Sequence, residues 1–133
     1  MKIFSLIIIL GIFSCRALEK EKEIDICGSN NFYQRVEKVS LDDIDRIKKL
    51  DGKFVEVEGF LHANFEDLAL YPSKHSHSLD AIWLNSKLPD SLLDKVNAKK
   101  VKIIGRVNIL DKGHLNGYLA ALDSTFCIKE VMH

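Results

Sequence analysis

Two stretches of this chain share one pattern, in which apolar and polar residues alternate and a glycine interrupts the run. They are KFVEVEGFL at residues 53–61 and KKVKIIGRVNIL at residues 99–110. A period of two residues is typical of a β-strand with one buried face, and a glycine inside such a strand indicates a bend or a bulge. We therefore expect both segments to be bent strands that wrap one small β-barrel.

Three further segments predict strands and two predict helices. The strands are expected at 64–71, ending before Pro72, at 80–84 and at 118–131. SLDDIDRIKKLDG at 40–52 predicts a helix with Ser40 as N-cap and Gly52 after its end. A helix of about two turns is expected to open at Pro89.

The order of these elements is helix, three strands, short helix, two strands. That is the order of the OB-fold, a five-stranded Greek-key barrel with a helix between its third and fourth strands. We therefore predict a mainly β, OB-like Greek-key barrel with that short helix and one N-terminal helix. An antiparallel β-sandwich is the alternative, although five strands are few for it. A chain of 133 residues has room for one such domain.

The first fourteen residues have the shape of a signal peptide. Lys2 precedes an apolar run at 3–13 that is too short to span a bilayer. IFSC at 12–15 then resembles the lipobox of bacterial lipoproteins, which implies that Cys15 carries lipid and becomes the new N-terminus. Cleavage by ordinary signal peptidase after Ala17, or an uncleaved anchor, are the alternatives.

These features divide the chain into a signal peptide at 1–14, a lipidated tether at 15–31 and an OB-like domain at 32–133. The expected location is the bacterial cell envelope, where the N-terminal lipid would hold the protein to a membrane. Arg16 stands where an aspartate would resemble the inner-membrane retention signal of enterobacterial lipoproteins. The outer membrane is therefore favoured.

Cysteine usage fits an exported chain. If Cys15 carries lipid, Cys27 and Cys127 remain as a pair. In an oxidising compartment they would form a disulfide that ties the start of the mature protein to its last strand. Two separate thiols are the alternative.

Five segments resemble a set of bacterial OB-like proteins related to the tRNA-anticodon-like OB group. They lie between about residues 50 and 130 and read DGKFVEVEGFL, ALYPSK, AIWL, KKVKIIGRV and KGHLNGYLAAL. The resemblance implies a barrel and brings no catalytic residues and no activity with it.

Three aromatic residues could line the barrel face on which OB-folds stack bases or sugars: Tyr71, Trp83 and Tyr118. Trp83 stands between Ile82 and Leu84, so we expect it to pack in the core rather than to meet a ligand. Tyr71 and Tyr118 stand near strand ends, and we expect them to be more open to a ligand.

His75 and His77 are spaced so that both side chains would project to one side of an extended segment, as metal ligands could. No Cys or acidic pattern at metal spacing stands near them, and Lys74 would repel a cation. We therefore interpret 73–80 as a solvated polar loop, and we expect neither a metal nor another cofactor.

Charge argues against a polyanionic partner. The chain has 19 basic and 19 acidic residues, and removal of 1–14 deletes only Lys2, which leaves 18 against 19. Such a chain has no overall field to attract nucleic acid, which is therefore not expected as a partner. No nucleophile motif or phosphate-binding glycine loop occurs either, so we expect no enzyme.

These observations together predict an exported lipoprotein with a small OB-like binding module. Its partner would be an envelope protein, a peptide or a glycan. A small inhibitor or immunity-type lipoprotein is one alternative. A metal-dependent enzyme that uses His75 and His77 is another.

Overall fold

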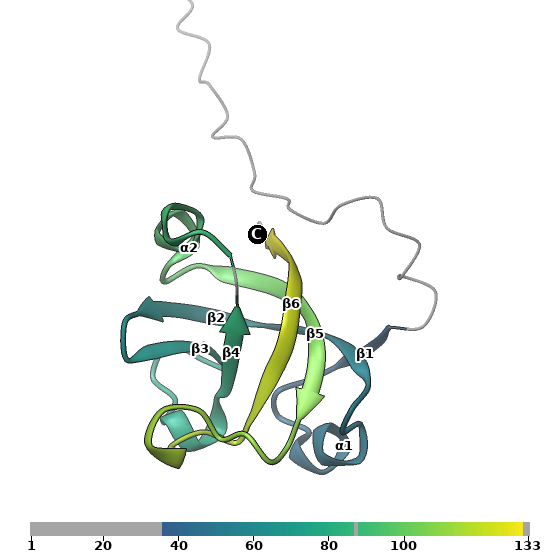
Figure 1. Cartoon of the computed structure of the whole chain (residues 1–133). Coiled ribbons are helices and arrows are strands. Elements are labelled where there is room, and N and C mark those ends of the chain that lie inside the picture. The colour runs from purple at the N-terminus through teal and green to yellow at the C-terminus, as the bar shows by residue number, and fades with distance from the viewer. Residues whose placement is uncertain (1–35, 87, 132–133) are drawn as a thin grey trace, which may run out of the picture.

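The computed structural model describes residues 36–86 and 88–131 (Figure 1). Its strands are β1 (Glu37–Val39), β2 (Phe54–Asn64), β3 (Asp67–Tyr71), β4 (Ile82–Ser86), β5 (Lys100–Asn108) and β6 (Ala120–Glu130). Its helices are α1 (Ile44–Lys49) and α2 (Asp90–Val96), with two 3₁₀ turns, η2 (Ser78–Asp80) and η3 (His114–Asn116).

Five strands close into a barrel in the order β2, β3, β4, β6, β5 and back to β2. Every pair in this ring is antiparallel except β4 and β6, which are parallel. With α2 between the third and fourth barrel strands, this is the OB-fold arrangement. The predicted fold is therefore confirmed, and the sandwich alternative is wrong.

Strand β2 is long enough to pair with β1, β3 and β5. Residues Phe54 to Phe60 pair with β5, and Phe60 to Asn64 pair with β3. Gly59 stands next to Phe60, where the two pairings meet, and a Cβ atom at Gly59 would lie 2.6 Å from the carbonyl oxygen of Tyr71. Only glycine permits this approach of β3 to β2 without a shift of the backbone, so the glycine inside this strand has a direct steric cause.

The barrel interior is filled by the apolar halves of the alternating strands. The fully buried side chains include Val55, Val57, Leu61, Leu70, Ile82, Leu84, Val101, Ile103, Leu122 and Ile128. Ile47 of α1 and Val96 of α2 belong to the same core. Burying each large aliphatic side chain contributes roughly 1.5–3 kcal/mol, so these residues account for the choice of register.

The first helix begins later than the sequence predicted. Asp43, not Ser40, is the N-cap, and its carboxylate accepts a 3.1 Å hydrogen bond from the backbone N–H of Arg46. Ser40 instead closes a turn before the helix, since its Oγ accepts from the N–H of Asp42 and its carbonyl from the N–H of Asp43. Two successive local caps compete here, and the one nearer the helix prevails.

Other boundaries also move. β2 continues to Asn64 and β3 begins only at Asp67, so Phe65 and Glu66 form a two-residue turn inside the segment predicted as one strand. The short strand β1 was not predicted, and it pairs in parallel with β2 opposite Val55 to Val57.

The signal peptide at 1–14, the lipidation residue Cys15, the tether at 15–31 and Cys27 lie outside the described residues. Within the described part of the chain, no helix has the length and apolar character needed to cross a membrane.

Candidate functional site

A row of side chains crosses the outer surface of the barrel. His62 of β2 is paired with Ala69 of β3, Ala69 with Trp83 of β4, and Trp83 with Ala121 of β6. Residues in register project from the same face of a sheet, so the four side chains share this surface. Alanine on both sides of Trp83 leaves room for the indole ring to lie along the sheet.

Trp83 is partly exposed and is held from several sides. Its Nε1 donates a 3.0 Å hydrogen bond to Oδ1 of Asn85, and its ring centroid lies 5.0 Å from that of Tyr118. Gly113 lies so close that a Cβ there would be 2.6 Å from Cγ of Trp83. The indole is thus fixed in place while part of it stays accessible.

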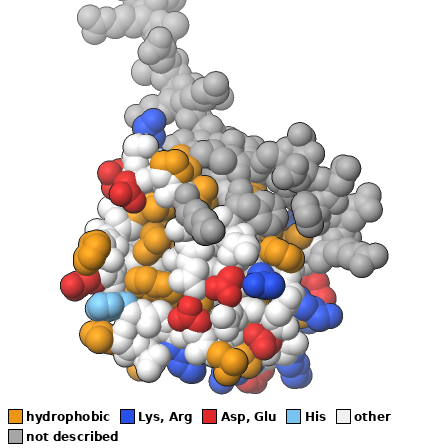
Figure 2. Space-filling view, viewed as in Figure 1, with side chains coloured by type: hydrophobic (Ala, Val, Ile, Leu, Met, Phe, Trp, Pro, Cys, Tyr) orange, Lys and Arg blue, Asp and Glu red, His pale blue; other side chains and the backbone are white. Residues whose placement is uncertain are grey.

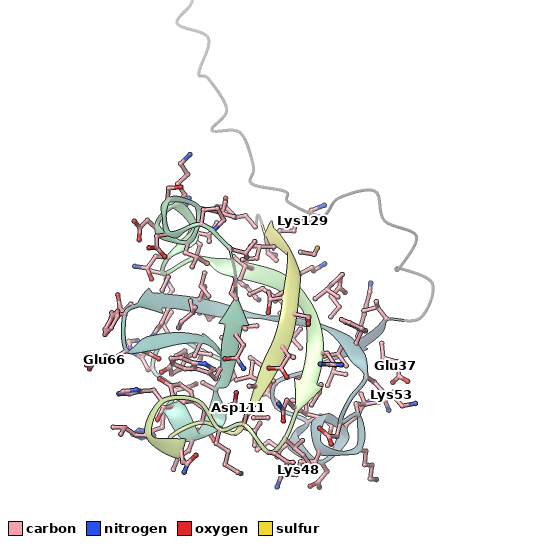
Figure 3. The ribbon with its side chains drawn as sticks, in the orientation of Figure 1. Glu37, Lys48, Lys53, Glu66, Asp111 and Lys129 are labelled. Carbon is pink, nitrogen blue, oxygen red and sulfur yellow. The ribbon has the colours of Figure 1, made fainter. Side chains whose placement is uncertain are left out.

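Asn85 connects this tryptophan to two carboxylates. Its Nδ2 donates 2.7 Å hydrogen bonds to Oδ2 of Asp111 and to Oδ1 of Asp123. Nδ2 of Asn108 donates to the other oxygen of Asp123 at 2.9 Å. Asp111 lies near the lower ends of β4 and β6 in Figure 3. The network therefore joins β4, β5 and β6 to the loop at 109–119.

A second cluster surrounds the carboxylate of Asp67. Oδ1 accepts 2.7 Å hydrogen bonds from the hydroxyls of both Tyr71 and Tyr118. Oδ2 lies 2.9 Å from Nδ1 of His62, whose ring stacks on Tyr71 with 4.0 Å between centroids. Three side chains, from β2, β3 and the end of the 109–119 loop, thus meet at the Asp67 carboxylate.

Burial and hydrogen bonding set the charge of this cluster. Desolvation raises the pKa of Asp67, but the hydrogen bonds from Tyr118, His62 and Tyr71 outweigh it and hold that pKa below its ordinary value. Burial and the Asp67 carboxylate raise the pKa of Tyr118 to about 12 and also raise that of Tyr71. At neutral pH the carboxylate is therefore charged and both phenols are protonated donors.

A groove of about 400 Å³ opens beside Trp83, between the β2–β3 hairpin and the start of α2. We name it the hairpin–helix groove, and it is lined by Ala63, Asn64, Phe65, Leu68, Trp83, Asp90, Leu93 and Asp94. Figure 2 shows hydrophobic and acidic side chains close together on the left of this view, where Figure 1 places α2 and the hairpin. The ring of Phe65 is 100% exposed.

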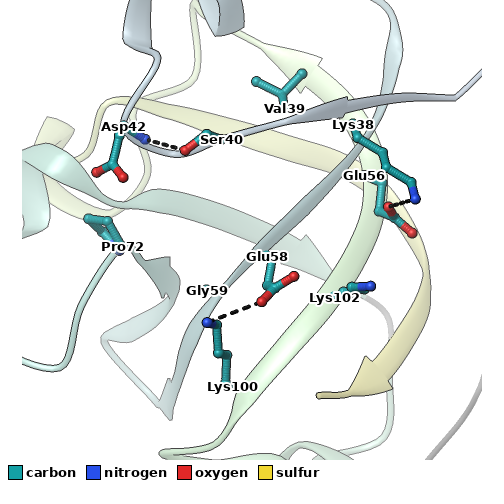
Figure 4. A pocket seen from close by; sticks show the side chains of 10 residues that line it. All are labelled: Lys38, Val39, Ser40, Asp42, Glu56, Glu58, Gly59, Pro72, Lys100 and Lys102. Carbon is teal, nitrogen blue, oxygen red and sulfur yellow. Dashed lines mark hydrogen bonds and ion pairs between the residues drawn. The ribbon is translucent and has the colours of Figure 1, made fainter. Parts of the chain in front are cut away.

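A second cavity, of about 420 Å³, lies over β1, β2 and β5 (Figure 4). It is lined by charges of both signs, with Lys38 3.8 Å from Glu56 and Lys100 3.1 Å from Glu58. Because cations and carboxylates already pair across it, this cavity does not select the charge of a ligand.

The structure brings three of the predicted ligand-binding residues together: Tyr71, Trp83 and Tyr118. Their exposure differs from the expectation. Tyr71 is 5% exposed and Tyr118 is 6% exposed, with both hydroxyls bound to Asp67, whereas Trp83 reaches the surface. The two tyrosines are covered because they pack in a small cluster outside the barrel, with Ala69 and Ala81. A direct role for either in ligand binding remains a prediction.

The histidines of the polar loop are exposed and lie between β3 and β4. Among residues 36–86 and 88–131, no group of three or more His, Cys, Asp or Glu side chains could hold a metal ion. His75 and His77 are thus not joined by a third ligand from the described residues.

Sequence reasoning missed the residues that shape the site most: Asp67, Asn85 and Phe65. The stretch Asn64–Asp67 was assigned to a strand, although two turn-forming side chains frame a two-residue loop there. The separation of Asn64 and Asp67 by two residues could have predicted this hairpin. Nothing local in the sequence marks the acceptor roles of Asp67 and Asn85.

No protein-family model matches this chain, and no curated protein matches it. Among solved structures, it is similar to a proposed aspartyl-tRNA synthetase from Leishmania major Friedlin, with 12% sequence identity and a TM-score of 0.46. The match covers 79% of this chain and 22% of the other, so this chain corresponds to a small part of that protein.

Proposed function

We propose that this chain is an exported, lipid-anchored binding module that holds a protein, peptide or glycan partner at the hairpin–helix groove. The observation that carries the proposal is Trp83, fixed on the outer face of the barrel while it lines a groove with the fully exposed Phe65. OB-folds bind ligands on their second and third strands and at the loop before them, which here are β3, β4 and the hairpin turn.

The charge of the groove supports a partner other than nucleic acid. Its described lining contains two carboxylates, Asp90 and Asp94, and no basic side chain. Binding of a nucleic-acid backbone depends on lysine and arginine near the phosphates. A phosphate backbone would be repelled here, whereas proteins, peptides and glycans need no cationic surface.

Anchoring is the second part of the proposal, and it is supported by the sequence of residues 1–15. In this proposal Cys15 carries the lipid, the tether spans 15–31, and the outer membrane is favoured. Two or three acyl chains hold far better than one, because each buried methylene contributes about 0.8 kcal/mol.

We further propose a disulfide between Cys27 and Cys127. Cys127 is 2% exposed and is paired with Ile104 across β5 and β6. A bond there would attach the tether, which contains Cys27, to the last barrel strand. Closing a loop of about 100 residues contributes up to about 4–5 kcal/mol.

Mass spectrometry of the mature protein from a bacterial envelope tests both covalent proposals. We expect a lipid-modified N-terminal Cys15, which Cys15→Ser abolishes. After denaturation without reductant, we expect no alkylation of Cys27 or Cys127. A mature chain that begins beyond Cys15 without lipid would refute the anchoring, and two alkylated cysteines would refute the disulfide.

Binding is tested with the full chain in detergent, immobilised and exposed to solubilised envelope. Phe65→Ser should release a partner that the unmodified chain retains, because Phe65 lines the groove. Leu110→Ser is the matched control, since Leu110 is 87% exposed and is not among the groove residues. Equal retention by the two variants would refute this site. A retained macromolecule whose own activity falls would favour the inhibitor alternative.

A further inference from the structure

We infer that the hairpin–helix groove binds a basic polypeptide segment. An apolar side chain of that segment would contact Phe65 and Leu93, and a lysine or arginine would lie at Asp90 and Asp94. This inference rests on the proposed function and names the class of its partner.

One apolar side chain of the groove, that of Phe65, has no evident role in folding. Phe65 occupies a two-residue hairpin turn, and its ring is fully exposed, so it adds nothing to the barrel core. Leu68 and Trp83 are partly buried beside it, and Leu93 is the buried floor contributed by α2. Covering an exposed phenyl ring with apolar groups of a partner removes that surface from water, which favours binding.

The acidic part of the groove consists of two carboxylates on α2. Asp90 and Asp94 are exposed and stand four residues apart on α2, which places two like charges on the same face of the helix. Neither forms an ion pair with a residue in the described ranges 36–86 and 88–131. A lysine or arginine between them would replace this repulsion with attraction.

The path of the strands suits an extended polypeptide. β3 and β4 are paired only at Ala69 with Trp83 and at Leu70 with Ile82. Beyond these pairs the two strands separate, and Leu68 and Trp83 line the groove from either side of the opening. An extended peptide could lie along it and offer backbone donors and acceptors at the spacing of a strand.

Three labelled probes test the inference against the full chain in detergent. They are ten-residue peptides that alternate lysine with leucine or glutamate with leucine, and a ten-nucleotide oligouridylate. We expect the lysine peptide to bind about ten times more tightly than the glutamate peptide, and its affinity to fall as salt is raised. Trp83 is the single tryptophan of the chain, so its fluorescence should change on binding.

Paired variants separate a specific site from general attraction. Asp90→Asn with Asp94→Asn should weaken the lysine peptide by about fivefold, the effect expected of two exposed charges. The control is Asp42→Asn with Asp45→Asn, which removes the same charge next to and within α1 and should change affinity less than twofold. Circular dichroism of both double variants verifies that the helices persist.

Each outcome decides between the two proposals. Equal weakening by the two double variants, or tighter binding of the glutamate peptide or the oligouridylate, would overturn the inference. If no lysine peptide binds but Phe65→Ser still releases an envelope partner, the groove is a binding site for another class of partner. If neither effect occurs, the proposed function at this groove fails as well.

Discussion

The hydroxyl of Tyr118 donates a 2.7 Å hydrogen bond to Oδ1 of Asp67, although the two residues stand 51 positions apart in the chain. The bond joins the end of the β5–β6 loop to the first residue of β3. Leu68, the next residue along β3, lines the hairpin–helix groove. The Asp67 cluster therefore fixes one wall of the groove relative to the rest of the barrel.

Replacing Asp67 with alanine should lower the free energy of unfolding by about 2–3 kcal/mol, because two protonated phenols lose a charged acceptor. The carboxylate side chain is 28% exposed, so water will partly replace it. Urea denaturation at neutral pH measures the change. Glu66→Ala is the matched control, because the neighbouring Glu66 points away from the barrel (Figure 3), and it should cost less than about 0.5 kcal/mol.

The phenols of Tyr71 and Tyr118 should ionise at a higher pH than an ordinary tyrosine. The folded-state pKa of Tyr118 is raised from 10.0 to about 12, so its hydrogen bond stabilises the fold fully below pH 10 and is lost as pH rises through about 12. Tyr71 is shifted in the same direction. Phenolate absorbance of the folded chain should therefore show two late-ionising tyrosines. Tyr118→Phe should remove one of them, and ionisation of all tyrosines near pH 10 would contradict the cluster.

The fold could be predicted because its signals are local. Alternation at 53–61 and 99–110 determines which face of each strand is buried, and the helix signal at Pro89 falls between the third and fourth barrel strands. β1 was missed because three residues are too few for a period to be recognised. Its strand conformation depends on pairing with β2, which is a tertiary contact.

The site could be predicted by residue type but not by exposure. Aromatic character singled out Tyr71, Trp83 and Tyr118, and the structure does place them together. Which of them reaches the surface depends on the acceptor that each finds. Asp67 accepts hydrogen bonds from both tyrosine hydroxyls, whereas Asn85 accepts one from the indole of Trp83 at the edge of the groove. Contacts between such distant segments leave no local pattern.

The N-cap of α1 gives a direct test of the corrected helix boundary. Asp43→Ala should lower the free energy of unfolding by about 1 kcal/mol, since it removes the acceptor for the backbone N–H of Arg46. Ser40→Ala should cost less, because Ser40 only closes the preceding turn through the N–H of Asp42. Thermal or urea unfolding of the two variants compares them. A larger loss for Ser40→Ala would restore Ser40 as the functional cap.

Gly113 should prove essential to the position of Trp83. Its φ of +67° is disfavoured for residues with a side chain, and an added Cβ would lie 2.6 Å from Cγ of the indole. Gly113→Ala should therefore destabilise the fold by about 1–3 kcal/mol and displace the ring. Because Trp83 is the single tryptophan, its fluorescence emission reports the displacement directly.

Gly52→Ala separates backbone strain from contact with the ring. Gly52 has a φ of +77°, but an added Cβ there would meet nothing within 4 Å. This variant should lose about 1 kcal/mol of stability with unchanged tryptophan emission. A red shift confined to Gly113→Ala would mean that the glycine holds the indole against the barrel face. The same variant should then weaken every ligand that contacts Trp83, and unchanged emission in Gly113→Ala would contradict the packing of Gly113 on the ring.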